Sequence, residues 1–337
     1  MSANISDFDT RLAAAIDGKT KPIGALGRIE TLAATIARVQ TTLTPRIETS
    51  HLTIFAGDHG MAQAGVSAYP QAVTRQMVLN FLDGGAAANV FAASVGATLQ
   101  VVDAGVAGEP ISHPKLLDRR ISAGTQNAIE QAAMTSDQLD TALQAGKDIG
   151  RAITADVACF GEMGIANTSS ATLLAAKCLD LSIAALTGRG TGLDDAGLKT
   201  KTDLLQKAAD RTRPTLDATT ALREYGGFEI AMMTGAMLGA AATGRVILVD
   251  GFIATAAALC ARDLEPACET SFVFAHRSDE QGHRLVLDSM QARPLLELDM
   301  RLGEGTGALL AFPLVKAAAA MLSDMASFES AGVSGPV

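Results

Sequence analysis

The sequence predicts an α/β fold in which helices cover both faces of a mostly parallel β-sheet. Short apolar runs of strand length, bounded by glycines, alternate along the chain with longer amphipathic or alanine-rich runs of helical length. A polar, glycine-rich loop follows each strand-like run. Strands that alternate with helices form βαβ units, whose crossovers make neighbouring strands parallel. Ligands bind beyond the carboxyl ends of such strands, so these loops are where we expect a site.

The first part of the chain predicts two helices, then a strand, a loop and a third helix. Residues 7–17 and 26–40 have apolar positions at helical spacing. Residues 51–60 read as a short buried strand that runs into the polar loop GDHG. Residues 70–85 predict a helix with Pro70 near its first turn, where proline is well tolerated.

The rest of the chain repeats one pattern, a helix followed by a strand. Such pairs are predicted at residues 84–96 and 97–106, 136–151 and 155–164, 228–244 and 245–251, and 252–264 and 270–278. Two more helices are predicted at residues 166–178 and 307–322. The repeated order places at least five strands in one sheet.

Composition and charge narrow the class of protein. The chain has 337 residues, of which 48% are hydrophobic and 19% charged, and its formal net charge is −9. These values suit a globular protein with a sizeable core. An acidic chain without a long basic run is a poor partner for nucleic acid. The N-terminus lacks a basic region followed by an apolar stretch, and charged residues or glycines interrupt the apolar segments, so we expect a cytoplasmic protein with no membrane partner.

Glu304 stands out because glycines flank it directly in RLGEGTGA, residues 301–308. Glycine lets a backbone turn sharply and approach a ligand closely, and Thr306 is expected to cap the helix that follows. A carboxylate placed there has two interpretations. It can simply be stabilised by the positive end of the helix, which is the structural role, or it can act as a general base.

Two glycine-rich loops can hold an anion. In GEMGIANTSS, residues 161–170, we expect Asn167, Thr168 and Ser169 at the start of a helix, whose free amides attract negative charge. The alternative is ordinary helix capping with no ligand. TGRGTG, residues 187–192, is a second such loop, and Lys199 and Lys201 follow it. Two such loops in one parallel sheet strengthen the case for an anion site.

No pattern in the sequence predicts a metal ion or a cofactor. Asp58, His59, His276 and His283 could be imagined as metal ligands, but their spacing matches no known ligand set, so we expect structural or substrate-positioning roles. The four cysteines show no paired spacing, so we expect reduced thiols in the core. A serine hydrolase is not indicated either, because the sequence lacks a G-x-S-x-G elbow.

Taken in order, the motifs of this chain resemble those of the nicotinate-nucleotide dimethylbenzimidazole phosphoribosyltransferase family. The motifs are GDHG, GVSAYPQ, VTRQMV, FLDGGAAAN, GEMGIANTS, TGRGTG, GGFEIAMMTGAML, ILVDGFI, HRS with GH, and RLGEGTGA. The resemblance runs from about Lys21 to Leu322. It is specific because so many long motifs recur in one order.

The resemblance implies both an architecture and a reaction. The implied fold is a Rossmann-like sheet domain at residues 46–294, with a small helical domain formed by residues 1–45 and completed by residues 295–337. A homodimer is implied as well. The implied reaction converts nicotinate mononucleotide and dimethylbenzimidazole into α-ribazole phosphate and nicotinate. Use of adenine or a phenolic base, and a catalytically silent nucleotide-binding protein, remain as alternatives.

The resemblance also implies roles for single residues, carried over motif by motif. Glu304 would be the general base, and Glu162, also catalytic, would border the benzimidazole pocket with Gln76. Lys201, Gly190 and Ser278 would lie at the phosphate or ribose of the nucleotide. The other residues expected to contact substrate are Ala68, Tyr69, Pro70, Met77, Met163, Gly164, Asn167, Thr168, Gly188 and Gly303.

Overall fold

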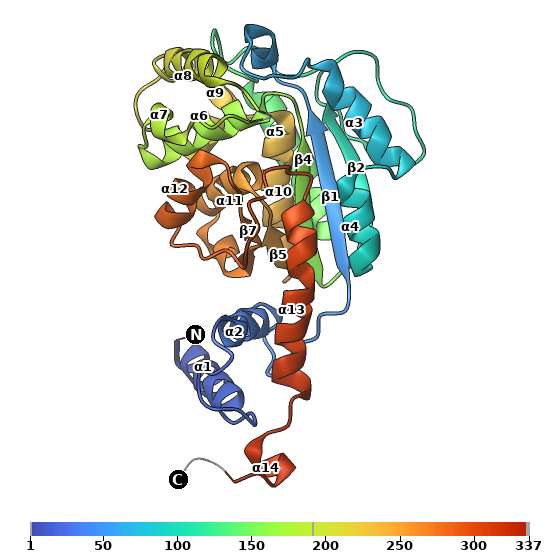
Figure 1. Ribbon diagram of the computed structural model, residues 1–337, viewed down its shortest axis with the longest axis vertical. Coiled ribbons are helices and arrows are strands. Elements are labelled where there is room, and N and C mark those ends of the chain that lie inside the picture. The colour runs from blue at the N-terminus through green and yellow to red at the C-terminus, as the bar shows by residue number, and fades with distance from the viewer. Residues whose placement is uncertain (1, 191, 335–337) are drawn as a thin grey trace.

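A six-stranded, fully parallel sheet forms the centre of the molecule (Figure 1). The computed structural model describes residues 2–190 and 192–334, so Thr191 of the TGRGTG loop and residues 335–337 lie outside the described residues. The strand order is β3-β2-β1-β4-β5-β6. The strands are β1 (Ser50–Gly57), β2 (Thr98–Gly105), β3 (Leu116–Asp118), β4 (Val157–Met163), β5 (Val246–Val249) and β6 (Phe272–Phe274). The order reverses between β1 and β4, which is the switch point where open parallel sheets bind ligands.

Helices cover both faces of the sheet, as predicted. One face packs against α5 (Ser136–Ala152), α6 (Asn167–Leu179), α10 (Phe228–Ala242) and α11 (Phe252–Leu264). The other packs against α3 (Ala72–Asp83), α4 (Ala87–Val95) and α13 (Thr306–Asp324), and α2 (Arg28–Gln40) extends this core by packing on α13. Side chains alternate along β1, so Phe55 enters the first core and Leu52 and Ile54 enter the second.

Glycine sets how closely two of these helices approach. A Cβ atom added to Gly146 of α5 would lie 1.9 Å from the carbonyl oxygen of Met232 in α10. One added to Gly150 would lie 2.1 Å from the carbonyl oxygen of Ala236. Backbone against backbone at this distance leaves no room for any larger residue. The glycines therefore bring α5 and α10 into direct contact beneath the sheet.

The predicted strand at residues 270–278 is wrong in its length. The chain leaves the main sheet after β6, and β7 (His276–Arg277) pairs instead with β8 (Leu296–Glu297) in a separate two-stranded sheet. The elements that the sequence did not indicate are short or polar. They are β3, β8, η1 (Gly60–Ala64), α7 (Ile183–Leu186), α8 (Asp195–Ala209), α9 (Ala218–Tyr225), η2 (Pro266–Ser271), α12 (Gln281–Ser289) and α14 (Phe328–Ala331).

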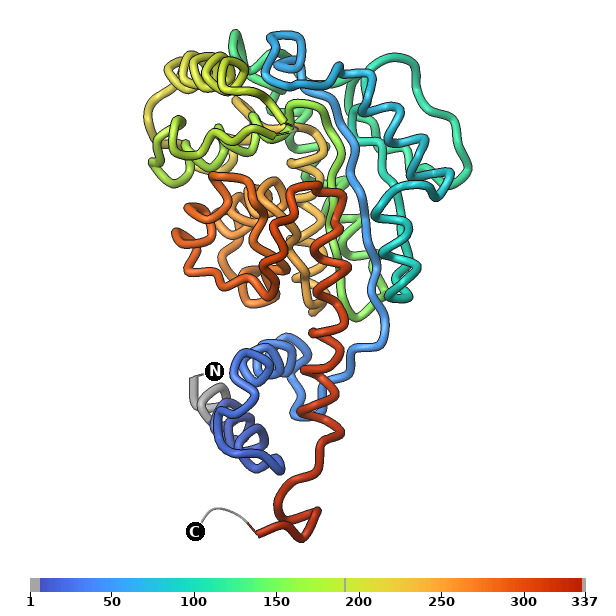
Figure 2. Tube along the Cα trace, in the orientation of Figure 1, coloured from blue at the N-terminus to red at the C-terminus, as the bar shows by residue number. Residues whose placement is uncertain are grey.

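The two ends of the described chain come together at one pole of the molecule. There α1 (Ser2–Asp17) and α2 lie beside the C-terminal half of α13, and α14 follows below (Figures 1 and 2). The Lys19 ammonium donates a hydrogen bond of 2.7 Å to the Met325 carbonyl. Arg46 pairs with Asp324 at 2.7 Å. The long helix α13 runs from this pole up to the sheet, so it connects the helical end to the strand ends.

Two segments are long and apolar enough to cross a membrane by length and composition alone, Ala72–Val95 and Thr306–Asp324. The first comprises two helices, α3 and α4, separated by Gly84 in the left-handed conformation. The second is α13, whose apolar side packs on the sheet and on α2. The second segment is mostly buried in the core and the first is about one-third buried there, and core helices pass the same test.

Candidate active site

A cavity of about 100 Å³ opens beyond the carboxyl ends of the central strands. Its wall combines the loops after β4 and β5, the TGRGTG loop, the segment after β7 and the residues before α13. Among the residues singled out in the sequence, the structure places on this wall Glu162, Met163, Gly164, Asn167, Thr168, Gly190, Ser278 and Gly303. Motifs far apart in the sequence are therefore brought to one place.

Cavity volume alone would have pointed elsewhere. One cavity of about 850 Å³ lies beside α1 and α2, at the amino end of β6. Another, of about 830 Å³, lies beside α5 and is lined in part by His51, Gln144 and Asp148. His51 is at the amino end of β1, so this cavity is at the end of the sheet opposite the usual ligand site of parallel folds. The smaller cavity is the candidate because it collects the polar loops.

Glu304 occupies a strained turn immediately before α13. Its backbone is left-handed, with φ 64°, between Gly303 at φ 84° and Gly305 at φ 80°. A Cβ atom on Gly161 of β4 would lie 2.4 Å from the Glu304 carbonyl carbon, so only glycine lets this turn rest on the strand. The prediction that Thr306 caps the helix is wrong. Gly305 is the N-cap and Thr306 begins the helix, with its hydroxyl donating to the Gly303 carbonyl at 2.7 Å.

The carboxyl group of Glu304 is buried, with one oxygen unpartnered among the described residues. Burial raises the pKa of this carboxyl, and the charge of Asp250 adds to the effect, while the backbone amide of Ala88 at the start of α4 lowers it. An ionised carboxylate accepts up to four hydrogen bonds, so a buried oxygen without a partner is free to take a proton or a donor from a ligand.

Asp250, which no sequence pattern assigned to the site, fixes the first turn of α13. It follows β5 directly, and its two carboxyl oxygens accept hydrogen bonds from the amides of Gly305 at 3.2 Å and Ala308 at 2.9 Å. His276 lies 3.6 Å from the same carboxylate. The position of Asp250 in VDG, at the carboxyl end of a predicted strand, was the signal that could have identified it.

Glu162 is the second carboxylate of the site and has different surroundings. It is the penultimate residue of β4, and the side-chain amide of Asn167 donates a hydrogen bond to it. Burial raises the pKa of Glu162 to about 8, and the charges of Asp250 and Glu229 add to the shift. The expected capping of α6 by side chains is wrong. Ala166 is the N-cap, in the left-handed conformation and with no side-chain cap.

Lys201 of α8 is not on the cavity wall itself, but it contacts Thr168, which is. Its ammonium donates hydrogen bonds to the Thr168 hydroxyl at 2.9 Å and to the Gly188 carbonyl at 3.2 Å. Burial lowers the pKa of Lys201 to about 8, although nearby Glu280 opposes this. Arg301 donates to the Gly190 carbonyl at 3.0 Å. The two cationic side chains bracket the TGRGTG loop, and Arg301 was missed although it opens the RLGEGTGA motif.

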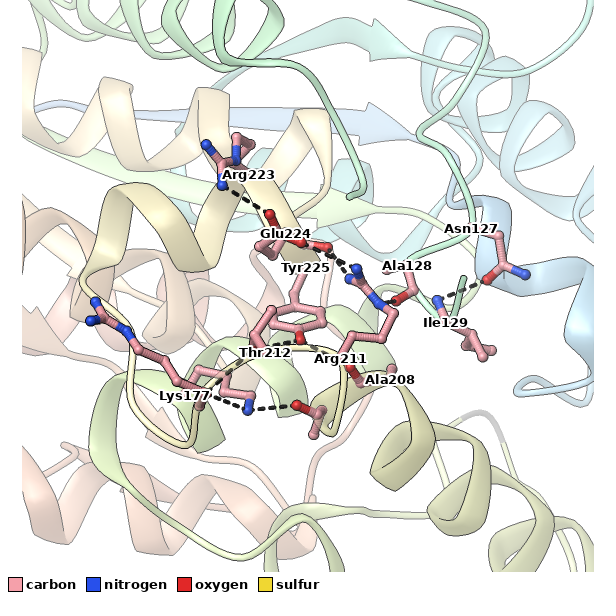
Figure 3. A network of polar contacts seen from close by, with 12 residues as sticks. Asn127, Ala128, Ile129, Lys177, Ala208, Arg211, Thr212, Arg223, Glu224 and Tyr225 are labelled. Atoms are coloured by element: carbon pink, nitrogen blue, oxygen red, sulfur yellow. Dashed lines mark hydrogen bonds and ion pairs between the residues drawn. The ribbon is translucent and has the colours of Figure 1, made fainter. Parts of the chain in front are cut away.

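A network of polar contacts holds the far end of α8 (Figure 3). The Tyr225 hydroxyl donates to the Ala208 carbonyl at 2.9 Å, and Lys177 donates to the Ala209 carbonyl at 2.7 Å. Arg211 donates to the Ala128 carbonyl at 2.9 Å and pairs with Glu224 at 3.2 Å. These contacts satisfy carbonyls at the helix end and so fix the helix that carries Lys201.

Ser278 is oriented by a neutral histidine. Its backbone amide donates to Nδ1 of His283 at 2.9 Å, while Nε2 of the same ring lies 2.9 Å from the Thr255 hydroxyl. Burial lowers the pKa of His283 to about 3, so the ring is uncharged at neutral pH. A nitrogen that accepts from an amide carries no proton, so His283 has the tautomer protonated on Nε2.

The segment predicted to hold the base lies beside the site but not on the cavity wall. Ala68, Tyr69, Pro70 and Gln76 are exposed, and Met77 is half-buried in the core beneath α3. The segment reaches the site through Thr74, whose hydroxyl accepts a hydrogen bond of 3.0 Å from the Ile165 amide in the loop after β4. Its predicted role in binding the base therefore stays a prediction.

The polar residues considered as metal ligands have separate partners. His59 pairs with Glu229 at 2.6 Å, both fully buried. A carboxyl oxygen of Asp58 accepts a hydrogen bond from the Ala107 amide at 2.8 Å. Within residues 2–190 and 192–334 no group of three or more His, Cys, Asp or Glu residues could hold a metal ion. The cysteines of the described chain are free thiols.

Comparison with known proteins gives matches along nearly the whole chain. A family model described as phosphoribosyltransferase matches residues 3–333. A protein of Dechloromonas aromatica (strain RCB) named nicotinate-nucleotide–dimethylbenzimidazole phosphoribosyltransferase is 56% identical over 335 residues, which cover 98% of this chain and 96% of that protein. A protein of the same name from Aromatoleum aromaticum (strain DSM 19018 / LMG 30748 / EbN1) is 53% identical, with 99% of each chain covered.

Solved structures give the same result for the fold. The crystal structure of CobT from Thermus thermophilus superposes with a TM-score of 0.94 at 42% sequence identity, covering 97% of this chain and 99% of that chain. A second structure, of nicotinate-nucleotide-dimethylbenzimidazole phosphoribosyltransferase from the same organism, gives 0.93 at 40% identity, covering 98% and 99%. This chain belongs to the nicotinate-nucleotide–dimethylbenzimidazole phosphoribosyltransferase family.

Proposed function

We propose that the protein transfers the phosphoribosyl group of nicotinate mononucleotide to 5,6-dimethylbenzimidazole, giving α-ribazole 5′-phosphate and nicotinate. The product would supply the lower ligand of cobalamin. Membership of the family supports this reaction, because relatives of that name match nearly the whole chain at about half identity. The observation that carries the proposal within the chain is the buried, partly unpartnered carboxylate of Glu304, directly after Gly303 of the cavity wall. Two cationic side chains bond to the TGRGTG loop, whose Gly190 lies on the same wall.

The chemistry requires one base and little else. A bond forms between a ring nitrogen of dimethylbenzimidazole and C1′ of the ribose, and the bond from C1′ to the nicotinate nitrogen breaks. The attacking heterocycle would become cationic unless its ring N–H loses a proton. A carboxylate whose pKa is raised by burial accepts that proton better than an exposed one does. Nicotinate leaves as a stable aromatic anion, so its departure needs no strong acid.

Glu304 suits the role of base better than Glu162 does. Glu162 has a pKa of about 8, so it is mostly protonated at pH 7 and can donate a hydrogen bond, whereas a base must be ionised. Glu162 also accepts a hydrogen bond from Asn167, while one oxygen of Glu304 has no partner among the described residues. We therefore assign proton removal to Glu304 and the orientation of the base to Glu162.

The nucleotide phosphate is assigned to the Lys201 side of the cavity. Lys201 and Arg301 supply positive charge, and the start of α6 supplies backbone amides beside Thr168. The residues assigned to the phosphate or ribose are Gly188, Gly190, Lys201 and Ser278. The leaving group of this reaction is nicotinate and not pyrophosphate. No magnesium ion is therefore needed to neutralise a pyrophosphate, and we propose no cofactor.

We also infer that the protein is a cytoplasmic homodimer. We infer that each copy is divided into the three segments expected from the sequence, residues 1–45, 46–294 and 295–337. Exposed apolar side chains on and beside α3 and α4, those of Tyr69, Leu79 and Val90, support a surface that a second copy covers. Contacts of α13 with α2, and of Lys19 with the Met325 carbonyl, support a helical domain formed by residues 1–45 and 295–337 beside the sheet domain at 46–294. Light scattering after gel filtration measures the oligomeric state directly.

The experiment that tests the function is product identification after incubation with nicotinate mononucleotide and a panel of bases. The expected result is release of nicotinate together with α-ribazole phosphate when dimethylbenzimidazole is present. Preferential product formation from adenine or a phenol would keep the reaction and change the acceptor. If no base led to release of nicotinate, the proposed reaction would be overturned. The alternative of a catalytically silent nucleotide-binding protein would then be favoured.

A further inference from the structure

The turn that carries Glu304 is not held in shape by its own sequence. Residues 303, 304 and 305 are all left-handed, and for the non-glycine residue among them, Glu304, that conformation costs about 1 kcal/mol. The helix that follows has glycine as its N-cap and no side-chain cap of its own. Such a turn persists only when its surroundings determine it. The contacts that do so must come from elsewhere in the fold.

Asp250 supplies them from the end of β5. Its two oxygens accept from the amides of Gly305 and Ala308, and the amide of Gly307 also stabilises its charge. A carboxylate there also faces the positive end of α13, a helix of 19 residues. Asp250 thus acts as an N-cap donated by a different segment, and it fixes both sides of the junction next to Glu304.

His276 links this cap to the cavity. Nε2 lies 3.6 Å from the Asp250 carboxylate, and the ring lines the cavity with Ser278. The ring also packs on the first turn of α13, because a Cβ atom on Gly307 would lie 2.0 Å from its Cδ2. His276 therefore touches the cap, the helix start and the nucleotide side of the site at once.

We propose that Asp250 and His276 form a positioning pair that holds the carboxylate of Glu304 in register with the bound nucleotide. The pair acts on the reaction through the Glu304 turn, so neither residue is a catalytic residue. The kinetic part of this proposal rests on the proposed function. Its structural part, that the pair determines the turn, stands independently.

The first test is Asp250→Asn. An asparagine keeps one acceptor oxygen but turns an N–H toward the Gly305 amide, so one end of the cap is lost. We expect kcat to fall about 10- to 100-fold, as displacements of about 1 Å do, with KM for nicotinate mononucleotide near that of the wild type. Asp217→Asn is the matched control, since Asp217 caps α9 through the Thr220 amide at 2.9 Å, and it should leave kcat unchanged.

The second test asks whether the effect passes through Glu304. In an enzyme that already carries Glu304→Gln, adding Asp250→Asn should cause almost no further loss of kcat, because residues that act as a unit are not additive. Gly307→Ala, which crowds the His276 ring without removing a charge, should lower kcat in the same way. An equal loss from Asp250→Asn in both backgrounds would overturn the proposal.

Hydrogen exchange gives a readout that does not depend on turnover. The amides of Gly305 and Ala308 should exchange faster in Asp250→Asn than in the wild type, while those of α9 should not change. Unchanged exchange at both amides would overturn the proposal even if the activity fell. If the wild type releases no nicotinate, the proposed function fails, and faster exchange in the variant still supports the positioning pair.

Discussion

Two glutamates in one site have different properties because of what surrounds them. Glu162 lies at the end of a strand, bonded to Asn167 and close to the charges of Asp250 and Glu229. Glu304 lies on a strained turn with one oxygen unpartnered among the described residues. When their surroundings give two carboxyl groups different pKa values, one site can provide both a proton donor and a proton acceptor.

The raised pKa of Glu162 predicts a pH-dependent stability. The folded protein holds the proton up to a pKa of about 8, while the unfolded chain releases it near 4.5. The contribution of Glu162 to the free energy of unfolding is therefore complete below pH 4.5. It is lost as the pH rises from there through 8, by up to about 1.4 kcal/mol for each unit of pH. The free energy of unfolding of the wild type should fall steadily relative to that of Glu162→Gln from about pH 5 to 8, as measured by denaturant titration. A difference that stays constant contradicts the shift.

Lys201 predicts a limit at alkaline pH. Its pKa of about 8 means that the ammonium loses its charge as the pH rises through 8, so kcat/KM for nicotinate mononucleotide should fall there. Lys201→Met should raise KM for the nucleotide about 10- to 100-fold, the range for a hydrogen bond to a charged group, and should flatten the pH profile. Lys199→Met is the control, since Lys199 is exposed and its ion pair within the described chain is with Asp203 of the same helix. An unchanged KM in Lys201→Met would show that Lys201 does not bind the phosphate.

At the scale of elements, the sequence predicted what local pattern determines and failed where a distant segment decides. The long helices and central strands follow from apolar periodicity, and all five expected strands exist in some form. Strand order does not follow, because it depends on pairings between segments far apart. The two helix starts show the same limit. Thr168 and Asn167 were expected as caps. Their side chains instead hydrogen-bond to Lys201 and Glu162, and no local sequence rule connects either pair.

The segment before α3 yields a prediction about choice of base. Ala68 is exposed, so Ala68→Tyr adds bulk without crowding the core, and the fold should be preserved. If Ala68 lines the pocket for dimethylbenzimidazole, the variant should bind that base more weakly and nicotinate mononucleotide nearly as before. Calorimetric titration of each ligand separately checks this. Equal losses for both ligands, or none for either, would show that Ala68 does not line the base pocket.

For the whole molecule, the architecture explains why motifs spread over the chain converge. The sheet is parallel throughout, so the loops after β1, β4 and β5 leave from the same edge, and the reversal of strand order between β1 and β4 opens a crevice there. Glu304 lies at that crevice immediately before α13, and the helix runs from there to the helical pole (Figure 1). The sequence indicated this edge and these loops. Asp250 and His276 gained their importance from the packing of α13 against β5, and Arg301 from its contact with Gly190.

Single-turnover kinetics and nucleotide binding, compared between Glu304→Gln and the wild type, decide whether Glu304 is the base. Glutamine keeps the shape of the side chain and cannot accept the proton, so the chemical step should slow about 10²- to 10⁴-fold. Affinity for nicotinate mononucleotide should stay the same, and the melting temperature should not fall, because a buried carboxyl with a raised pKa is removed. A single-turnover rate equal to that of the wild type would contradict the assignment of Glu304 as the base.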